Sequence, residues 1–396
     1  MSTRIDQGVT KRLEGVIPGT SSVVRIDFDK AIQAVDDLLH PPDVGEFVAP
    51  GFIDLQVNGF AGVDYNDPLV PHDAIAQSVR TMFTTGVTRF FPTVITGSEE
   101  RMVGALQNLA SAKEEFAGSG MPEADAMEAF HVEGPHISPE DGPRGAHPVE
   151  HVRPPDIEEF KRWQDAAQGQ VRLVTVSPEW EQTPQYVREL VRIGVVASIG
   201  HTKATAEQIE VAIDAGASMS THLGNGAHSM LPKTNNYIWQ QLSADRLAAS
   251  FIVDGIHIPR SFFAVALRAK GVERSVLVTD AVMPAMCDPG LYKLGQVEVE
   301  LRADGSVVLR GGTRLAGSAL RMDKAIGHAV RMGGISLRHA VSMATVNPAR
   351  VGRIPGRQRG LTPGEKADFV RFRWEDASQS LEVRETIVAG VTVYRA

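Results

Sequence analysis

A repeating unit between about residue 50 and residue 280 constrains the fold of this chain more than any other feature. Each unit contains a short β-rich run, a polar loop and a helical stretch, often followed by a glycine. Strands that alternate with helices pair in parallel, so this pattern predicts an α/β protein with a (β/α)₈ TIM barrel. The eight candidate strands are 52–57, 88–92, 128–132, 171–176, 195–199, 218–221, 248–253 and 275–279.

Helix signals support the repeat. The clearest helical stretch covers 204–215, where Thr205 and Gln208 have the spacing of a capping box. A glycine just before a strand is typical of the left-handed residue that ends a helix. Four glycines have this position: Gly86, Gly194, Gly216 and Gly271.

Both ends of the chain have a different pattern, with short β-like runs between glycines and prolines. Runs at 23–28, 368–374 and 385–391 are expected to pair as a small β-sandwich domain formed by the two termini. Residues 29–39 are predicted to form a helix rather than a strand. The expected domains are therefore 1–49 and 356–396, which share the small β domain, and 50–355, which forms the barrel.

The composition excludes several classes of protein. The chain has 396 residues, a formal net charge of −8 and no clustered Lys/Arg stripe, so nucleic acid is not an expected partner. No run approaches the length of a membrane span, and residues 1–13 lack the apolar core of a signal peptide. The single cysteine, Cys287, excludes an intramolecular disulfide and favours a cytoplasmic location.

Four of the candidate strands are followed by a residue that can bind a metal or move a proton. These residues are Glu133, His201, His222 and Asp280. A (β/α)₈ barrel carries its chemistry at the carboxyl ends of its strands, and neighbouring ends lie side by side. Two imidazoles and one carboxylate leave a coordination position open for water, as in a catalytic metal site. A nearby carboxylate can take the proton of that water and return it to a leaving amine.

Each of these residues also has a structural interpretation. A single histidine is usually a hydrogen-bonding residue in a polar rim, Glu133 alone could be a surface acid, and Asp280 could cap the following helix. Two histidines at equivalent ends of consecutive strands weaken that interpretation. The ordered set favours a metal-assisted enzyme.

Short motifs spread from about residue 49 to residue 372 carry a family resemblance. They are APGFID (49–54), HVEGP (131–135), GHT (200–202), THLGN (221–225), VDGIH (253–257), VTDA (278–281), LAGS (315–318), MATVNPA (343–349) and GEKAD (364–368). On these motifs the chain resembles the amidohydrolase superfamily, and within it the N-acetylglucosamine-6-phosphate deacetylases. The resemblance implies an enzyme of amino sugar metabolism.

One departure from the superfamily concerns the number of metal ions. Most amidohydrolases have a His-x-His motif after the first strand, which holds a second metal, and this chain has Gln56 and Asn58 there. An amide side chain is a poor ligand for a transition metal. The chain is thus similar to the single-metal deacetylases, in which Glu133, His201 and His222 would hold one Zn²⁺ or Fe²⁺ ion. Two-metal chemistry of the dihydroorotase or urease kind is not expected.

The resemblance implies hydrolysis of the acetamido group of N-acetyl-D-glucosamine 6-phosphate to glucosamine 6-phosphate and acetate. Asp280 would serve as general base and then as general acid. Ala146 and His147 match a family loop whose histidine can donate to the developing oxyanion. The stretch at the acetyl end of the substrate comprises Leu315, Ala316 and Gly317.

The expected phosphate end differs from the family. Asn225 and Gly226 match a phosphate-contacting pair, and His257 matches a sugar-contacting histidine. The usual Arg-Glu-Pro-Gly segment is absent, and Lys233 stands where the family arginine lies. Lysine supplies charge but not a bidentate fork. In the family this residue reaches the neighbouring subunit's site, which implies a homodimer.

Three alternatives stay open at this level. The altered segment around Lys233 is compatible with an N-acetylgalactosamine 6-phosphate substrate or with an unphosphorylated N-acetyl sugar. A non-enzymatic alternative is a metal-free amidohydrolase-like scaffold protein. The intact set of Glu133, His201, His222 and Asp280 argues against the scaffold.

Overall fold

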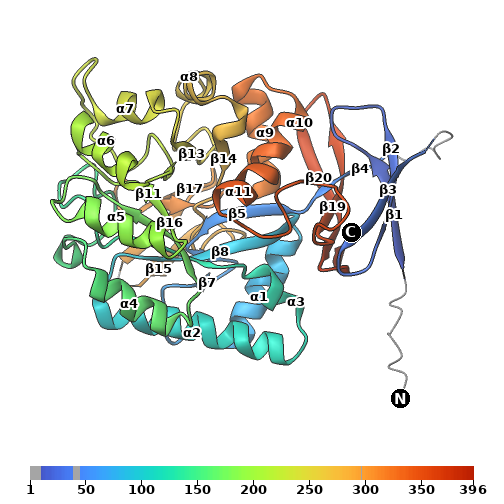
Figure 1. Ribbon diagram of the computed structural model, residues 1–396, viewed down its shortest axis with the longest axis horizontal. Coiled ribbons are helices and arrows are strands. Elements are labelled where there is room, and N and C mark those ends of the chain that lie inside the picture. The colour runs from blue at the N-terminus through green and yellow to red at the C-terminus, as the bar shows by residue number, and fades with distance from the viewer. Residues whose placement is uncertain (1–9, 39–44, 296) are drawn as a thin grey trace.

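The computed structural model describes residues 10–38, 45–295 and 297–396, and its central unit is a barrel of eight parallel strands (Figure 1). The strands follow the barrel in the order in which they occur along the chain. All eight predicted strands are confirmed, and each overlaps its predicted range. They are β5 (Phe52–Val57), β8 (Val87–Ile95), β9 (Phe130–Glu133), β10 (Val171–Val176), β11 (Val196–Ile199), β12 (Met219–Ser220), β13 (Ala248–Phe251) and β14 (Ser275–Leu277).

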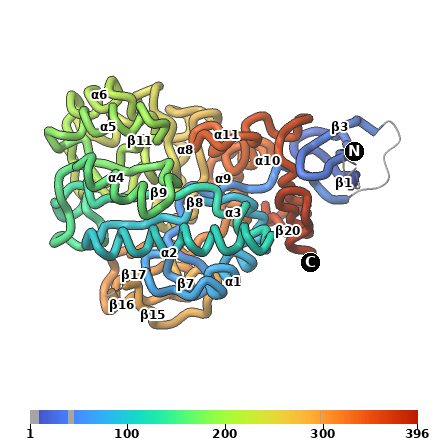
Figure 2. The backbone as a smooth tube through the Cα atoms, turned by 60° about the horizontal axis from the view of Figure 1, so that its bottom comes forward, coloured from blue at the N-terminus to red at the C-terminus, as the bar shows by residue number. Residues whose placement is uncertain are grey.

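Helices cover the outside of the barrel (Figure 2). Among the described residues, no helix is both long enough and apolar enough to cross a membrane. The helices are α1 (His72–Phe83), α2 (Glu99–Gly118), α3 (Pro122–Ala126), α4 (Ile157–Ala166), α5 (Thr183–Arg192), α6 (Ala206–Ala215), α7 (Tyr237–Ser243), α8 (Arg260–Lys270), α9 (Met322–Gly333), α10 (Leu337–Met343) and α11 (Val346–Val351), with 3₁₀ turns η1 (Val149–His151) and η2 (Val272–Arg274).

The predicted helix signals are present in α6. Thr205 and Gln208 form the reciprocal capping box, and Gly216 ends the helix with a φ of 114°. Gly86 and Gly194 also have positive φ. Gly271 has a φ of 71° but a ψ of 162°, so it turns the chain out of α8 without the left-handed helical conformation.

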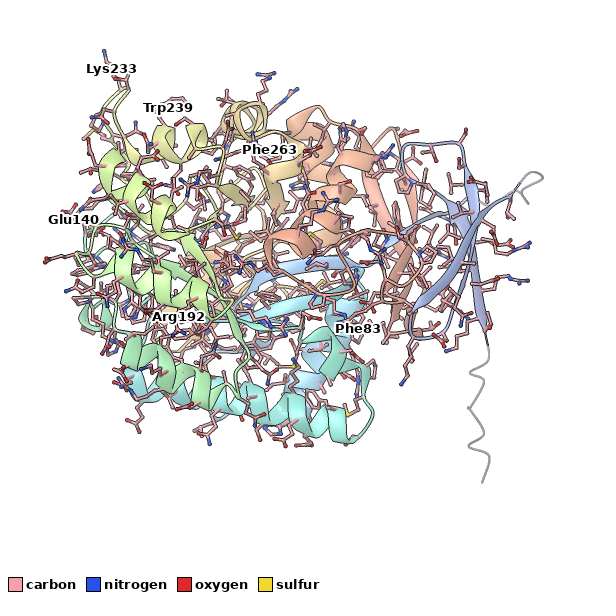
Figure 3. The ribbon with its side chains drawn as sticks, viewed as in Figure 1. Phe83, Glu140, Arg192, Lys233, Trp239 and Phe263 are labelled. Atoms are coloured by element: carbon pink, nitrogen blue, oxygen red, sulfur yellow. The ribbon has the colours of Figure 1, made fainter. Side chains whose placement is uncertain are left out.

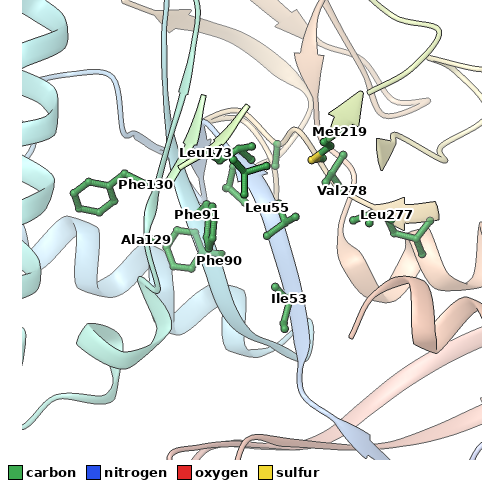
Figure 4. Close-up of a cluster of buried hydrophobic side chains, with 14 of the residues drawn as sticks. Ile53, Leu55, Phe90, Phe91, Ala129, Phe130, Leu173, Met219, Leu277 and Val278 are labelled. Atoms are coloured by element: carbon green, nitrogen blue, oxygen red, sulfur yellow. The ribbon is translucent and has the colours of Figure 1, made fainter. Parts of the chain in front are cut away.

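The barrel strands are buried on both faces, as expected for a parallel sheet enclosed by helices. Every residue of β5 is buried, and so are nearly all residues of β8. Figure 4 shows side chains of this core, which join neighbouring strands to the helical layer. The residues labelled there are Ile53, Leu55, Phe90, Phe91, Ala129, Phe130, Leu173, Met219, Leu277 and Val278.

The barrel closes between its first and eighth strands through side chains and the ends of the strands. The Asp54 carboxylate on β5 accepts hydrogen bonds from the backbone N–H and the hydroxyl of Thr279, at 3.2 and 2.6 Å. Beyond them, the N–H of Asp280 donates to Gln56 at 3.0 Å and the N–H of Asn58 donates to Ala281 at 2.7 Å. We call this set of contacts between β5 and the segment after β14 the barrel seam.

The two chain termini form one strongly curled sheet beside the barrel (Figure 1). Two strands, β4 and β1, lie between Phe28 on β2 and Phe369 on β19 in this sheet, yet the centroids of the two rings are 4.9 Å apart. The sheet therefore folds over its own core, which confirms a small β domain built from both termini. Its order is β21-β20-β19-β4-β1-β2-β3, with β1 (Lys11–Val16), β2 (Val23–Phe28), β3 (Ile32–Asp37), β4 (Phe47–Pro50), β19 (Phe369–Glu375), β20 (Ser380–Val388) and β21 (Val391–Arg395).

The predicted helix at 29–39 is wrong where the structure describes it. Residues 32–37 form strand β3, which pairs antiparallel with β2. Leu39, the last residue of the predicted helix, lies outside the described residues. Residues 1–9, part of the segment that lacks the pattern of a signal peptide, also lie outside them. Hairpin pairing outweighs the local helical preference of this segment. The exact domain limits at 49 and 356 stay a prediction.

A further antiparallel sheet, which the sequence analysis did not predict, lies between β14 and α9. It contains β15 (Gly290–Leu294), β16 (Val297–Leu301), β17 (Ser306–Leu309) and β18 (Leu315–Ser318) and lies near the hairpin of β6 (Gly59–Phe60) and β7 (Val63–Asp64) (Figure 2). The N–H of Ser318 donates to Asp280 and the N–H of Val282 donates to Ser318, so β18 runs directly beside the segment that carries Asp280.

A buried ion cluster joins the barrel to the curled sheet. Asp368 accepts two hydrogen bonds from Arg89 on β8, at 2.7 and 3.1 Å, and another from Arg357. Arg357 also donates to the Gly51 carbonyl at 2.6 Å. Burial alone would raise the pKa of Asp368, but the two guanidinium groups outweigh burial and hold that pKa well below its usual range.

Replacing Asp368 by Asn should lower the free energy of unfolding by about 3–5 kcal/mol near pH 7, because the buried Arg357 loses its ion-pair partner and Arg89 keeps only Asp125 and Glu128. Urea unfolding measures this change. The control is Asp27→Asn, which breaks an exposed ion pair with Arg12 and should change stability little. Equal stability of Asp368→Asn and the wild type would contradict the role of the cluster.

The same variant has a defined pH dependence. A carboxyl with a depressed native pKa contributes stability above its unfolded pKa of about 3.9 and loses that contribution as the pH falls further. The stability difference between the wild type and Asp368→Asn should therefore be constant at neutral pH and shrink below about pH 4.

Candidate functional site

A pocket of about 510 Å³ opens at the carboxyl ends of the barrel strands. Its walls come from the loops after these strands and from the sheet β15–β18. All predicted site residues except Lys233 line it. They are Glu133, Ala146, His147, His201, His222, Asn225, Gly226, His257, Asp280, Leu315, Ala316 and Gly317.

Three of these side chains meet at their ligating atoms. Glu133 Oε1 lies 2.8 Å from His222 Nε2 and 3.2 Å from His201 Nε2, and the two imidazole nitrogens are 3.2 Å apart. Glu133 is the last residue of β9, and the histidines follow β11 and β12. We call this arrangement the ligand triangle.

The ligand triangle has the chemistry of a cation site. If both nitrogens carried protons toward Glu133, they would repel each other at 3.2 Å, and hydrogen bonds alone cannot satisfy all three contacts. A cation at the centre is attracted by all three atoms, and Zn–N and Zn–O bonds of about 2.0–2.2 Å suit ligands at such separations. The residues present therefore fit a transition-metal ion.

Neighbouring groups orient the ligand triangle. Nδ1 of His201 donates to the Pro143 carbonyl at 2.8 Å, which turns the Nε2 lone pair toward Glu133. The His147 ring lies 4.5 Å from the His201 ring, and a ligating atom of His147 lies within 4.8 Å of those of Glu133 and His201. His147 is thus a second imidazole at the edge of the same site, farther from Glu133 than His222 is.

The backbone of this site is strained. His201, His222 and Asp280 have φ values of 48°, 28° and 50°, in the left-handed region that residues with a Cβ seldom adopt. Such conformations cost free energy and persist where the surrounding structure enforces them, often at functional sites. The strand ends turn sharply here, which brings all three side chains to the floor of the pocket.

His147 is a buried neutral base that faces the site. Burial first, and then the nearby His201, lower the pKa of His147 to about 3. Its Nδ1 lies 2.8 Å from the hydroxyl of Thr96. When that hydroxyl donates to Nδ1, the proton of the neutral ring is on Nε2, which can then donate a hydrogen bond into the pocket.

Asp280 is half-buried at the pocket floor. Burial raises its pKa to about 6, and the negative charge of Glu133 adds to this rise. One carboxylate oxygen, Oδ1, accepts a hydrogen bond from Asn58 Nδ2 at 2.6 Å. A carboxyl group with a pKa near 6 can both accept and return a proton near neutral pH.

The residues of the expected sugar end are held by short local contacts. Asn225 Nδ2 donates to the backbone carbonyl of His222 at 3.2 Å. A Cβ atom on Gly226 would lie 2.6 Å from the His201 ring, so a larger residue would displace that ring. His257 Nδ1 pairs with Asp254 at 2.5 Å, which leaves its Nε2 as the remaining polar atom of the ring.

Lys233 does not line the pocket of its own chain. Figure 3 shows it at the tip of the projecting loop before α7, where its side chain is exposed. Trp239 in the same region is also exposed, and its indole N–H donates to the Lys233 carbonyl at 3.1 Å. Contact of Lys233 with a neighbouring subunit's site stays a prediction.

Several residues of the pocket are not among those predicted from the sequence. Thr96 follows β8, but β8 extends to Ile95 whereas the predicted strand ends at residue 92, so the strand-end rule does not reach Thr96. Arg101 on α2 and Arg314 before β18 also line the pocket, and Arg314 pairs with Asp141 at 2.9 Å. No local motif marks these arginines, because the pocket brings them together from distant segments.

Replacing Glu133 by Gln should remove most of the bound metal, because the amide lacks the charge of the carboxylate ligand. Elemental analysis of the purified variant measures the metal content. The control is Glu140→Gln, an exposed glutamate of the following loop, which should keep the wild-type content. A full complement of metal in Glu133→Gln would show that the ion is held elsewhere.

Comparisons with known proteins agree with this geometry. Residues 47–393 match the amidohydrolase family. The N-acetylglucosamine-6-phosphate deacetylase of Bos taurus is 35% identical over 365 residues, which cover 89% of this chain and 84% of that protein. The N-acetylgalactosamine-6-phosphate deacetylase of Shewanella sp. (strain ANA-3) is 33% identical over 395 residues, 97% of this chain and 91% of that protein.

A solved structure is also similar. The N-acetyl-D-glucosamine-6-phosphate deacetylase of Mycobacterium smegmatis, in complex with N-acetyl-D-glucosamine-6-phosphate, superposes with a TM-score of 0.85 at 29% identity. The alignment covers 98% of this chain and 100% of that chain.

Proposed function

The chain belongs to the amidohydrolase family, and from this premise we propose that it hydrolyses the acetamido group of N-acetyl-D-glucosamine 6-phosphate. The products are glucosamine 6-phosphate and acetate. The observation that carries the proposal is the ligand triangle beside Asp280 at the floor of one pocket. Relatives with 30–35% identity over most of the chain are deacetylases of this kind.

One divalent ion per subunit, Zn²⁺ or Fe²⁺, would be held by Glu133, His201 and His222. These three have the shortest distances between ligating atoms, whereas His147 lies at the edge of the group. When bound, such an ion polarises the amide carbonyl and makes water more acidic. A metal-free scaffold would have no use for three converging buried ligands, so this alternative is disfavoured.

The side chains of this protein move the protons of the reaction. Asp280 takes a proton from the attacking water as the water oxygen bonds to the carbonyl carbon. His147 donates its Nε2 proton as a hydrogen bond to the oxygen that becomes negative. When the carbon–nitrogen bond breaks, Asp280 gives its proton to the nitrogen, so the amine leaves neutral. The other proton of the water stays on the acyl product, which leaves as acetic acid and ionises to acetate in solution.

The polarity of the pocket supports the orientation of the substrate. Beside Asp280, the wall is apolar and consists of Val282, Leu315 and Ala316, which suits the acetyl methyl group. Asn225 and His257 line the pocket as well and offer polar atoms for the sugar.

A second candidate substrate is N-acetyl-D-galactosamine 6-phosphate. The Shewanella relative with that specificity aligns with 97% of this chain, more than the Bos taurus relative does. Comparing kcat/KM for the two epimers tests the proposal: a higher value for the galacto epimer would replace the proposed substrate. A protein inactive on both, with a full metal content, would contradict the deacetylase function.

Replacing Asp280 by Asn should lower kcat about 10²- to 10⁴-fold, the usual contribution of a proton-transferring group. The metal content should stay at the wild-type level, because Asp280 is outside the ligand triangle. Release of free amine measures the rate. Asp288→Asn, an exposed aspartate of the same segment, should turn over normally, and near-normal turnover of Asp280→Asn would place the proton carrier elsewhere.

We also propose a homodimer in which Lys233 of one copy supplies positive charge to the substrate phosphate in the other. Its exposure on a projecting loop, with Trp239 and Met230 exposed nearby, supports this arrangement. A cytoplasmic location, indicated by the single Cys287, is part of the same proposal.

Replacing Lys233 by Ala should raise KM for the phosphorylated sugar about ten- to hundredfold, the effect of losing one charge-assisted hydrogen bond. Lys233→Arg should retain most of the affinity. Turnover of unphosphorylated N-acetylglucosamine should not respond to either change. An equal effect on both sugars, or a monomer in sedimentation, would contradict the shared phosphate site.

A further inference from the structure

We propose that the pocket continues beyond the acetyl position into a subsite for a carboxylate, where Arg101 binds the free acid end of a longer acyl group. The proposal rests on the deacetylase function above and widens it to N-acyl hexosamine 6-phosphates whose acyl group is a dicarboxylic acid attached by one end, such as succinyl. Such a group has methylene carbons in the middle and a negative charge at its end, and the pocket offers surfaces in the same order.

The sheet β15–β18 forms a wall that extends from the reacting groups to Arg101. At one edge of this sheet, the N–H of Ser318 on β18 donates to the Asp280 carbonyl at 3.2 Å. At the other edge, the turn after β15 approaches α2, since a Cβ atom on Gly295 would lie 3.4 Å from Arg101 Nη2. A group that leaves Asp280 along this wall therefore ends at the guanidinium.

The pocket has an aliphatic lining on this side. The side chains come from β8, α2 and the first two strands of the sheet, and they are Val94, Met102, Leu294, Val297 and Val299. The methyl group of an acetyl substrate can contact only the part of the lining nearest Asp280. The rest suits the methylene groups of a longer acyl chain.

This end of the pocket lies opposite the sugar end. Arg101 follows β8 and Asn225 follows β12, the second and sixth of the eight strands, which face each other across a closed barrel. Both residues line the same pocket. A substrate with its sugar at Asn225 and its amide at Asp280 therefore directs its acyl group toward Arg101.

Arg101 presents an accessible guanidinium to the pocket. A Cβ atom on Gly97 would lie 3.8 Å from Arg101 Cδ, and Gly97 and Gly295 both line the pocket, so the side chain follows the wall from one glycine to the other. Among the described residues, the guanidinium forms no ion pair and no hydrogen bond, yet none of its nitrogens is fully buried. These nitrogens can therefore bind a ligand that enters the pocket.

Asp64, an acid of the same wall, is held by the backbone. Its Oδ1 accepts the N–H of Asn66 at 2.9 Å, and its Oδ2 accepts the N–H of Gly295 at 3.2 Å. Burial raises the pKa of Asp64, and the charge of Arg101 opposes that rise. Asp64 thus fixes the turn beside Arg101 without forming an ion pair with it.

Two other charged residues of the pocket do not occupy Arg101. Glu150 is exposed, and Arg314 pairs with Asp141 at 2.9 Å. A guanidinium forms two parallel hydrogen bonds with a carboxylate, and Arg101 has its nitrogens available for this pair.

The position of Arg101 in α2 also favours an anion. The hydroxyl of Ser98, which precedes the helix, accepts the N–H of Arg101 at 3.3 Å, so Arg101 lies in the first turn. The partial positive charge at this end of a helix disfavours a cation and favours an anion. Glu99 and Glu100 of the same turn are exposed and outside the pocket. A bound carboxylate would be attracted by both the guanidinium and the helix.

The reaction remains the hydrolysis of an amide. The water oxygen bonds to the acyl carbon, the carbon–nitrogen bond breaks, and Asp280 gives its proton to the amine. The products are the amino sugar 6-phosphate and the dicarboxylic acid, and no further reactant is consumed.

The test compares kcat/KM for three amides of glucosamine 6-phosphate in the metal-loaded protein. They carry an acetyl group, a succinyl group, or a succinamoyl group, which has the length of succinyl but a neutral amide end. The wild type should prefer succinyl over succinamoyl about tenfold, the effect of one charge-assisted hydrogen bond. The same comparison with glutaryl and glutaramoyl covers a chain longer by one methylene group.

Replacing Arg101 by Gln should make the two longer substrates equal, because the positive charge is lost. Arg101→Lys should retain part of the preference, since lysine keeps the charge but not the fork. The matched control is Arg162→Gln, which removes an exposed charge from α4, a helix packed against α2, outside the pocket. The preference for succinyl should not change in this control.

Several results would overturn the proposal. They are equal kcat/KM for succinyl and succinamoyl in the wild type, a preference that persists in Arg101→Gln, and hydrolysis of the acetyl compound alone. Weaker inhibition by free acetate in Arg101→Gln, without a preference for succinyl, would assign Arg101 to the released product and overturn it as well. A protein that hydrolyses none of the compounds would contradict the deacetylase function too, which distinguishes that failure from the loss of the subsite alone.

Discussion

The barrel seam is the constraint on which the active site depends. The first and eighth strands do not meet along their full length, and the Asp54 carboxylate fills the gap by binding the backbone and hydroxyl of Thr279. Burial raises the pKa of Asp54 to about 7, so this link has a cost in free energy at neutral pH. The next contacts of the seam hold Asp280 and Asn58, so closing the barrel and placing Asp280 are one event.

The curvature of the strand ends is the second condition for the site. His201, His222 and Asp280 each leave their strand with positive φ, and an ordinary extended exit would send their side chains along the barrel axis or into the helical layer. The surrounding core is buried and includes hydrogen-bonded polar side chains such as Thr175 and Thr221, which supplies the rigidity that such strain requires. A well-packed barrel thus makes possible a local geometry that the chain would not adopt alone.

Much of this arrangement could be predicted from the sequence. The β/α alternation gave all eight strands, and the strand-end rule gave the ligand triangle and Asp280, because both depend on local patterns. The helix prediction for residues 29–39 failed because pairing with another strand determines the structure there. Residues 32–37 form a strand because they pair with β2. The sheet β15–β18 had a signal in the alternating run 297–301 and the turn at 303–306, which resembles a hairpin.

The curled sheet has a consequence for the order of events during synthesis. Strand β4, which leads into the barrel, lies between β1 and β19, and β19 is made only after the whole barrel has been translated. Asp368, which neutralises Arg89 inside the barrel, also arrives late. The amino-terminal hairpin must therefore wait for a partner from the far end of the chain, and pairings of such long sequence separation form slowly. Until then, the edge of β4 has no partner on the side of β19, and Arg89 lacks the carboxylate of Asp368.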